Sequence, residues 1–329
     1  CAYIFYASHS HPYQKYTEKQ VLMGTYVQMD VCKGSDGGDY ERAYQEAWKR
    51  LEEISWRMNV YDDKSDVAKI NASFQNPVKV ESDTFRIIER SKMFTDITGG
   101  AFDITVWPII ALWKKARTAN HLPTKKEINE ALAALGSDQI RLYGDGRIET
   151  LHPETSVDLG GIAKGYAIDE AARIFRQYGV ENFYIDAGGD VYAGGVNCSG
   201  EKWRIGLRHP SGDDELLDII HVSNQAVTTS GNYAQFYEIE GRLYSHIIDP
   251  RTGFPQEYVT SATVIAPTAE TADALSTALC VLTPREGIEL ILSQDNRHEG
   301  DYAALIITTD QDSAYERFET ENYKKNQSK

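Results

Sequence analysis

The stretch Phe236–Ile248 reads FYEIEGRLYSHII, and it decides the class of fold. Two short runs rich in aromatic and β-branched residues flank the turn Glu240–Arg242, which is the pattern of a β-hairpin. Between Gly179 and Pro267, similar short runs alternate with glycine, asparagine and aspartate. This part of the chain therefore predicts short strands joined by tight turns.

Helices are predicted elsewhere by apolar residues at helical spacing and by end signals. A capping box of Thr124 and Glu127 starts one helix, which Gly136 is expected to end. Because helices and hairpins are segregated rather than strictly alternating, the fold class is predicted as α+β with mostly antiparallel sheets and packed helices. Further helices are expected around Tyr44–Ile54, over Ile162–Tyr178 and from Pro284 on, and further strands over Gln20–Cys32, Ser261–Ala266 and Ala303–Thr308.

The length of 329 residues fits one large domain or two of ordinary size. Residues 1–19 read as an N-terminal tether, residues 20–320 as the body, and residues 321–329 as a polar tail. A sub-boundary near residue 150 is left open, because no linker marks it. No run approaches the roughly 18 consecutive apolar residues that a membrane-spanning helix needs.

The balance of charge restricts the ligands. Lys and Arg number 34 and Asp and Glu 49, which gives a net charge of −15. A surface this acidic repels a phosphate backbone, so general nucleic-acid binding is not expected. An anionic ligand must instead be met by a local cation, a helix N-terminus or a few placed basic side chains.

The chain has four cysteines, Cys1, Cys32, Cys198 and Cys280. No C-x-x-C pair is present, so a zinc ribbon or a thioredoxin-like site has no support, and a chain of this size does not need a disulfide. A chain numbered from a cysteine is what cleavage of a bacterial lipoprotein signal leaves, with lipid on Cys1; the alternative is a truncation that starts there. We expect a lipid-anchored protein of the bacterial cell envelope, on its periplasmic or extracellular face.

The segment Val157–Gly165 reads VDLGGIAKG and runs into a predicted helix. A glycine pair at a helix entry leaves backbone groups open to a ligand, and the helix dipole favours an anion there. Lys164 adds a positive charge in the first turn. The alternative is an ordinary glycine turn with a solvated lysine.

Asp273 and Thr277 lie four residues apart in the helical segment AETADALSTALCVL. They therefore share one helical face, and this pair of oxygen ligands suits a hard cation such as Mg²⁺. The alternative is an exposed aspartate beside a threonine that bonds its own helix backbone.

Two further side chains are candidates for chemistry. His246 ends a predicted strand, just before the turn DPRTG, and can take a proton near pH 7; the alternative is a structural histidine. Tyr61 follows a helix in the segment MNVY, where it could stack on a flat ring or fill the core. Glycine loops occur at Thr98–Thr105, Asp186–Asp190 and Thr228–Tyr233, and none has a P-loop or dinucleotide pattern.

Taken in order, these segments resemble the ApbE family of FAD:protein FMN transferases. The resemblance rests on MGT, M-x-x-Y, TGGAFD, VDLGGIAKGYAID, DAGGD, SGNY, HIIDPRTG and TADALSTAL, and runs from about Val21 to about Thr308. It implies an ApbE-like two-lobed architecture. It also implies Mg²⁺-dependent transfer of FMN from FAD to a Thr or Ser hydroxyl of an acceptor protein, with release of AMP.

The resemblance also assigns roles to single residues. It implies that His246 is the base and that the main-chain oxygen of Gly161 binds the metal with Asp273 and Thr277. The residues that it implies for FAD binding are Met23, Tyr61, Ala101, Phe102, Asp103, Asp158, Lys164 and Ile247. Two rivals remain: an FAD pyrophosphatase that yields FMN and AMP, and a lipoprotein that binds FAD without cleaving it.

Overall fold

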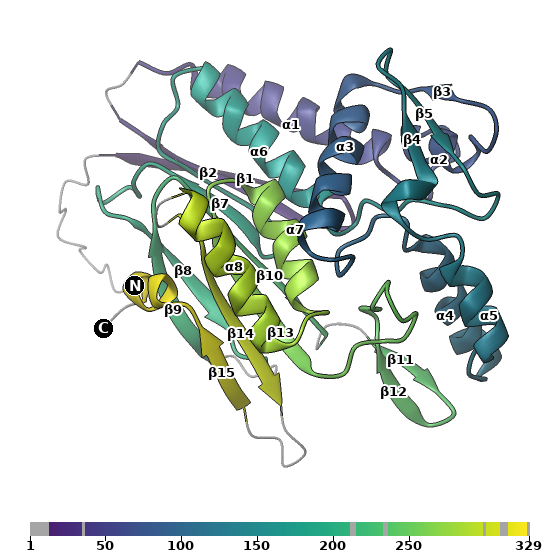
Figure 1. Ribbon diagram of the computed structural model, residues 1–329. Coiled ribbons are helices and arrows are strands. Elements are labelled where there is room, and N and C mark those ends of the chain that lie inside the picture. Colours follow the sequence, from purple (N-terminus) through teal and green to yellow (C-terminus); the bar gives the residue numbers. More distant parts are fainter. Residues whose placement is uncertain are drawn as a thin grey trace, which may run out of the picture.

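The computed structural model describes residues 13–34, 37–210, 215–232, 236–298, 301–309 and 315–327. Its centre is an eight-stranded sheet whose neighbouring strands are all antiparallel (Figure 1). The strand order is β1 (Gln14–Leu22), β2 (Thr25–Lys33), β6 (Phe183–Ala187), β7 (Asp190–Gly194), β10 (Gln225–Gly231), β13 (Val259–Ala266), β14 (Ala303–Thr309) and β15 (Tyr315–Glu319).

A layer of helices covers one face of this sheet, because alternate strand residues are apolar and point toward that layer (Figure 1). In β2, for example, Val27, Met29 and Val31 belong to the helix-side core, whereas Cys32 belongs to the core on the opposite face. The helices are α1 (Tyr40–Arg57), α3 (Ser82–Ile97), α6 (Ala163–Gln177), α7 (Ala269–Leu279) and α8 (Pro284–His298). The hairpin of β8 (Trp203–Arg208) and β9 (Leu216–Val222) covers the opposite face.

A smaller unit with its own apolar core lies beside this body (Figure 1). It contains α4 (Trp107–Ala119), α5 (Lys125–Leu132) and the hairpin of β11 (Phe236–Ile239) and β12 (Arg242–Ser245). A small sheet of β3 (Val78–Lys79), β5 (Arg147–Thr150) and β4 (Ile140–Leu142), with α2 (Asp66–Asn71), completes the fold. The predicted α+β class with mostly antiparallel sheets is confirmed, whereas the sub-boundary near residue 150 stays a prediction.

Most of the predicted end signals act as expected. Thr124 and Glu127 form the capping box of α5, and the β11–β12 hairpin turns through Glu240 and Gly241, both at positive φ. The predicted end of one helix is wrong, because α5 stops at Leu132 and Gly136 lies beyond it in the next loop.

The N-terminal prediction of a single strand over Gln20–Cys32 is wrong. Met23 and Gly24 take φ values of 53° and 73°, so the chain reverses there and forms the hairpin of β1 and β2. Residues 14–19, expected to be part of a tether, form most of β1. Residues 1–12, with Cys1, lie outside the described residues.

The polar tail expected over residues 321–329 is also ordered for most of its length. Helix α9 spans Glu321–Asn326 and places Tyr323 in full burial, where its hydroxyl donates to Asp218 at 2.8 Å. One buried aromatic side chain, bonded to the partly buried Asp218, therefore anchors a segment whose composition alone predicts fraying.

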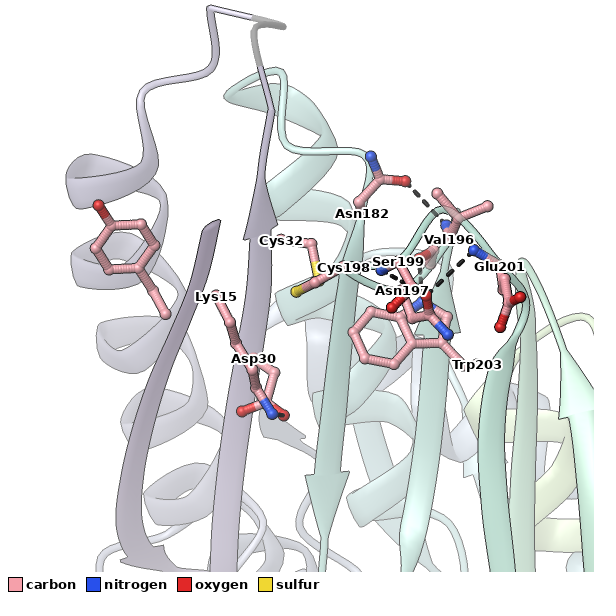
Figure 2. Close-up of a disulfide and its surroundings, with 12 residues drawn as sticks. Lys15, Asp30, Cys32, Asn182, Val196, Asn197, Cys198, Ser199, Glu201 and Trp203 are labelled. Carbon is pink, nitrogen blue, oxygen red and sulfur yellow. Dashed lines mark hydrogen bonds and ion pairs between the residues drawn. A yellow bond between two sulfur atoms is a disulfide. The ribbon is translucent and has the colours of Figure 1, made fainter. Parts of the chain in front are cut away.

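A disulfide joins Cys32, near the end of β2, to Cys198 in the loop between β7 and β8 (Figure 2). The side-chain oxygen of Asn197 accepts the backbone N–H groups of Ser199 and Glu201, which shapes this loop. The expectation that no disulfide is needed did not anticipate this bond, whose partners are 166 residues apart in sequence. None of the described helices is both long and apolar enough to cross a bilayer.

Candidate active site

Three of the motif segments meet at one point of the fold. The backbone N–H of Asp158 donates to the carbonyl of Ile104 at 2.7 Å, which ties VDLGGIAKG to TGGAFDIT. A methyl group on Gly161 would lie 3.1 Å from Oγ1 of Thr277 and 3.3 Å from the ring of Phe102. Segments distant in the sequence thus surround the same glycine turn.

The contact between α6 and α7 fixes the helix that carries Asp273. A Cβ atom on Gly165 would lie 2.2 Å from the carbonyl oxygen of Ala269, so only glycine fits at this crossing. The carboxylate of Asp169 accepts the N–H groups of Ala269 and Glu270 at 2.8 Å each. These contacts cap α7 at its first turn and fix its start against α6.

Asp273 is 2% exposed, and one of its carboxylate oxygens accepts the N–H of Gly165 at 3.0 Å. Burial raises the pKa of Asp273 to about 7, although the nearby charge of Lys164 opposes the rise. The ammonium of Lys164 contacts Asp190 and lies 3.8 Å from the other oxygen of Asp273. Burial favours the neutral amine, but Asp273 and Asp190 outweigh it and raise the pKa of Lys164.

These ion pairs argue against the alternative of a solvated lysine, because two buried carboxylates lie next to the Lys164 ammonium. The place of Lys164 in the sequence could not show this, since Asp190 is 26 residues away and Asp273 is farther. Its role in FAD binding stays a prediction.

The predicted metal ligands lie together. Thr277 follows Asp273 by one helical turn, and its hydroxyl lies beside Gly161 and 3.5 Å from the hydroxyl of Ser230. No group of three or more His, Cys, Asp or Glu side chains that could hold a metal occurs in the described residues. A cation here would bind one carboxylate and neutral oxygens, a set that fits Mg²⁺ with retained waters. One oxygen of the buried Asp273 carboxyl accepts the N–H of Gly165, and the other lies 3.8 Å from the Lys164 ammonium, beyond hydrogen-bond distance. The second oxygen fits as a ligand of such a cation.

A cavity of about 400 Å³ is lined by the β1–β2 turn, the end of α1 with the loop that follows it, and the glycine turn before α6. Its wall includes four of the residues predicted to bind FAD: Met23, Tyr61, Asp158 and Lys164. Tyr61 is 74% exposed, so it is not the core residue of the alternative interpretation. Burial raises the pKa of the Asp158 carboxyl, which accepts the N–H of Gly160 at 2.8 Å.

The other predicted residues of TGGAFD, Ala101, Phe102 and Asp103, do not line this cavity. All three are buried, and Asp103 accepts the N–H and the hydroxyl of Thr105 at 2.8 and 2.6 Å. Burial also raises the pKa of Asp103. Because Phe102 packs next to Gly161, this segment lies beneath the glycine turn and supports it.

His246 and Ile247 follow β12 and precede the DPRTG turn. The N–H of Ile247 donates to the hydroxyl of Ser245, and its carbonyl accepts from Gln256. Neither residue is in the cavity wall formed by the described residues. Their loop nevertheless adjoins TGGAFD, because a Cβ on Gly100 would lie 3.5 Å from the side chain of Arg251.

One side chain beside the cavity wall carries no signal in the sequence. The ammonium of Lys114, on α4, donates to the hydroxyl of Tyr61 at 2.9 Å and lies 4.5 Å from the ring centre of Trp107. The lysine belongs to an amphipathic helix without a motif, so only the fold shows its neighbours.

The comparisons with known proteins agree with this geometry. The model of the ApbE family matches residues 23–302. The FAD:protein FMN transferase of Haemophilus influenzae is 32% identical over 276 residues, which cover 81% of this chain and 80% of the relative. The crystal structure of the ApbE protein of Thermotoga maritima is 32% identical with a TM-score of 0.84, covering 96% of this chain and 100% of that chain.

The flavin transferase ApbE of Vibrio cholerae is 28% identical with a TM-score of 0.82, covering 95% of this chain and 99% of that one. A fold and a site of this kind define an enzyme of the flavin-transferase class, as the ordered motifs predicted. The chain belongs to the ApbE family.

Proposed function

We propose that this enzyme transfers FMN from FAD to a Thr or Ser hydroxyl of an acceptor protein, requires Mg²⁺ and releases AMP. One observation carries the proposal: Lys164, which lies 3.8 Å from the buried carboxyl of Asp273, lines the same cavity as the exposed side chain of Tyr61. Thr277 lies beside Gly161, which follows the wall residue Gly160. The diphosphate of FAD would lie near Lys164 and the flavin ring beside Tyr61.

The residues of the chain divide the work. Tyr61 stacks on the flavin ring, and Lys164 positions the carboxylate of Asp273 toward the diphosphate. Asp273, Thr277 and the carbonyl of Gly161 would hold Mg²⁺, which would neutralise charge on the phosphate oxygens and polarise them. His246 accepts the proton of the acceptor hydroxyl while the oxygen of that hydroxyl forms a bond to the FMN phosphorus. The bond between the FMN phosphorus and the AMP phosphate breaks, and AMP leaves.

The test uses the full chain with FAD, with and without Mg²⁺ and a purified candidate acceptor. An acceptor that gains the mass of FMN, together with AMP, supports the transferase. AMP and free FMN without any modified acceptor would support the pyrophosphatase instead. Bound but uncleaved FAD in the presence of Mg²⁺ and acceptor would leave only a binding protein.

We also propose that the enzyme works in the cell envelope. The bond between Cys32 and Cys198 supports this location, because structural disulfides persist in oxidising compartments and are rare in a reducing cytosol. Alkylation of thiols in intact cells before lysis tests it: the two cysteines should be protected, and full alkylation of both would contradict the proposal. The lipid anchor at Cys1 stays a prediction.

A further inference from the structure

The ammonium of Lys114 is held in place by uncharged partners. It donates to the Tyr61 hydroxyl at 2.9 Å and lies 4.5 Å from the centre of the Trp107 ring. No carboxylate forms an ion pair with it in the part of the chain that the structure describes, although the protein carries 49 acidic and 34 basic side chains. Lys69 and Lys324, by contrast, each pair with an acid one helical turn away.

This charge lies at the rim of the flavin cavity. Tyr61 and Asp158 both belong to the cavity wall, and Lys114 interacts with each. It donates to Tyr61, and its charge lowers the pKa of Asp158, which burial raises. Asp190 and Asp273 compensate Lys164, which belongs to the cavity wall, whereas Lys114 lies beside the wall residue Tyr61 without such a carboxylate among the described residues. The charge of Lys114 is therefore the one that remains available to a ligand.

The position of the ammonium on the tyrosine is specific. It lies 5.3 Å from the centre of the Tyr61 ring and bonds to the hydroxyl, so it stands at the hydroxyl edge rather than over the face. A flat ring stacked on Tyr61 would therefore have one edge next to Lys114. The flavin ring has a pyrimidine edge with carbonyl oxygens and an opposite edge with methyl groups, and a cation favours the carbonyl edge.

We propose that Lys114 binds the pyrimidine edge of the flavin ring of FAD and thereby fixes which way round the ring lies on Tyr61. The inference rests on the proposed function, because it requires FAD in this cavity. Lys114 is a binding and positioning residue: it takes no proton and forms no bond in the transfer.

The first test measures the dissociation constant of FAD by flavin fluorescence in EDTA, where no turnover occurs. Lys114→Met should weaken binding about tenfold, the size of one charge-assisted hydrogen bond. Lys114→Arg keeps the charge and should restore most of the affinity. Lys115→Met is the matched control, since Lys115 is the exposed neighbour on the same helix and should leave binding unchanged.

The second readout is the reduction potential of bound FAD. A cation beside the pyrimidine edge stabilises the added negative charge of the reduced ring. The potential in Lys114→Met should therefore shift to more negative values, while Lys114→Arg and Lys115→Met stay near the parent enzyme. A lysine that only supports the fold would not change this potential selectively.

The outcomes separate this inference from the proposed function. If the parent enzyme binds FAD neither in EDTA nor with Mg²⁺, the proposed function fails. If it binds FAD and Lys114→Met matches it in both affinity and potential, only the role of Lys114 fails. If Lys114→Met melts at a lower temperature than the parent enzyme, Tyr61→Phe provides the decisive test, because it removes the hydroxyl that holds the Lys114 ammonium. The reduction potential of FAD bound to Tyr61→Phe should also shift to more negative values. An unchanged potential would overturn the inference.

Discussion

The side chains of the proposed metal site are buried and held by several contacts, whereas Tyr61, which is proposed to hold the flavin, is exposed. Asp273 is 2% exposed and is bounded by Gly165 and Lys164, while Tyr61 is 74% exposed and is fixed mainly by Lys114 and Trp107. Phosphoryl transfer needs its charged groups in place before reaction, which burial provides. A flat substrate ring that enters and leaves needs an open surface instead.

The sharpest test of this contrast is Asp273→Asn. The amide has the same shape and still accepts the N–H of Gly165, but it removes the one carboxylate of the proposed metal site. We expect Mg²⁺-dependent release of AMP to fall by at least about a hundredfold. Chromatography of AMP with Mg²⁺ or EDTA measures it, with Thr277→Ser as a control that keeps the hydroxyl. Unchanged release would remove the metal role from Asp273.

His246→Ala tests whether chemistry can be separated from flavin binding. Since His246 is outside the cavity wall, the dissociation constant of FAD should stay close to that of the parent enzyme. Transfer to the acceptor should fall by about 10²–10⁴, the usual contribution of a general base. Single-turnover transfer followed by intact mass measures the rate. A normal rate would place the base elsewhere.

Gly165→Ala tests how tightly α6 and α7 pack where they cross beside the proposed metal site. The new methyl group would lie 2.2 Å from the carbonyl of Ala269, so α7 must shift or the helices must separate. We expect the free energy of unfolding to fall by about 1–3 kcal/mol. Urea unfolding measures this loss, and Gly144→Ala is the matched control because nothing lies within 4 Å of its added methyl. Equal stability of both variants would show that α6 and α7 are loosely packed.

The smallest predicted effect is a change of protein stability with pH. Burial raises the pKa of Asp169 to about 7, although two backbone N–H groups of α7 oppose the rise. The folded state therefore holds this proton more tightly than the unfolded chain, whose aspartate titrates near 4. This contribution to stability is present at about pH 4 and is lost as the pH rises through about 7.

Urea unfolding at several pH values compares the parent enzyme with Asp169→Asn, which cannot titrate. In the variant, the free energy of unfolding should lack the part of its decline between about pH 4 and 7 that Asp169 causes. An identical slope in both proteins would mean that Asp169 is already ionised in the fold and acts as an ordinary cap of α7.

The parts of the fold predicted correctly depend on local signals. The capping box at Thr124 and the turn at Glu240-Gly241 act within a few residues, so the sequence displays them directly. The hairpin at Met23 was missed because a methionine at positive φ is unusual, so Gly24 was interpreted as a tight point within one strand rather than as half of a two-residue turn. The order of Tyr323 depends on Asp218, about a hundred residues earlier.

The candidate site divides in the same way. Helical spacing alone places Asp273 and Thr277 on one face, and the structure brings Thr277 to Gly161 and Asp273 to Gly165 in the segment that follows. Compensation of Lys164 by two acids, and the hydrogen bond from Lys114 to Tyr61, join distant segments and follow only from packing. The sequence could therefore name candidate ligands but not their electrostatic surroundings.

The bond between Cys32 and Cys198 carries a consequence for the order of assembly. Strand β2 pairs with β6, whose residues are more than 140 positions later, and the cystine partner comes later still. During synthesis, the β1–β2 hairpin therefore gains its neighbour in the sheet and its covalent link only after more than half of the chain has been made.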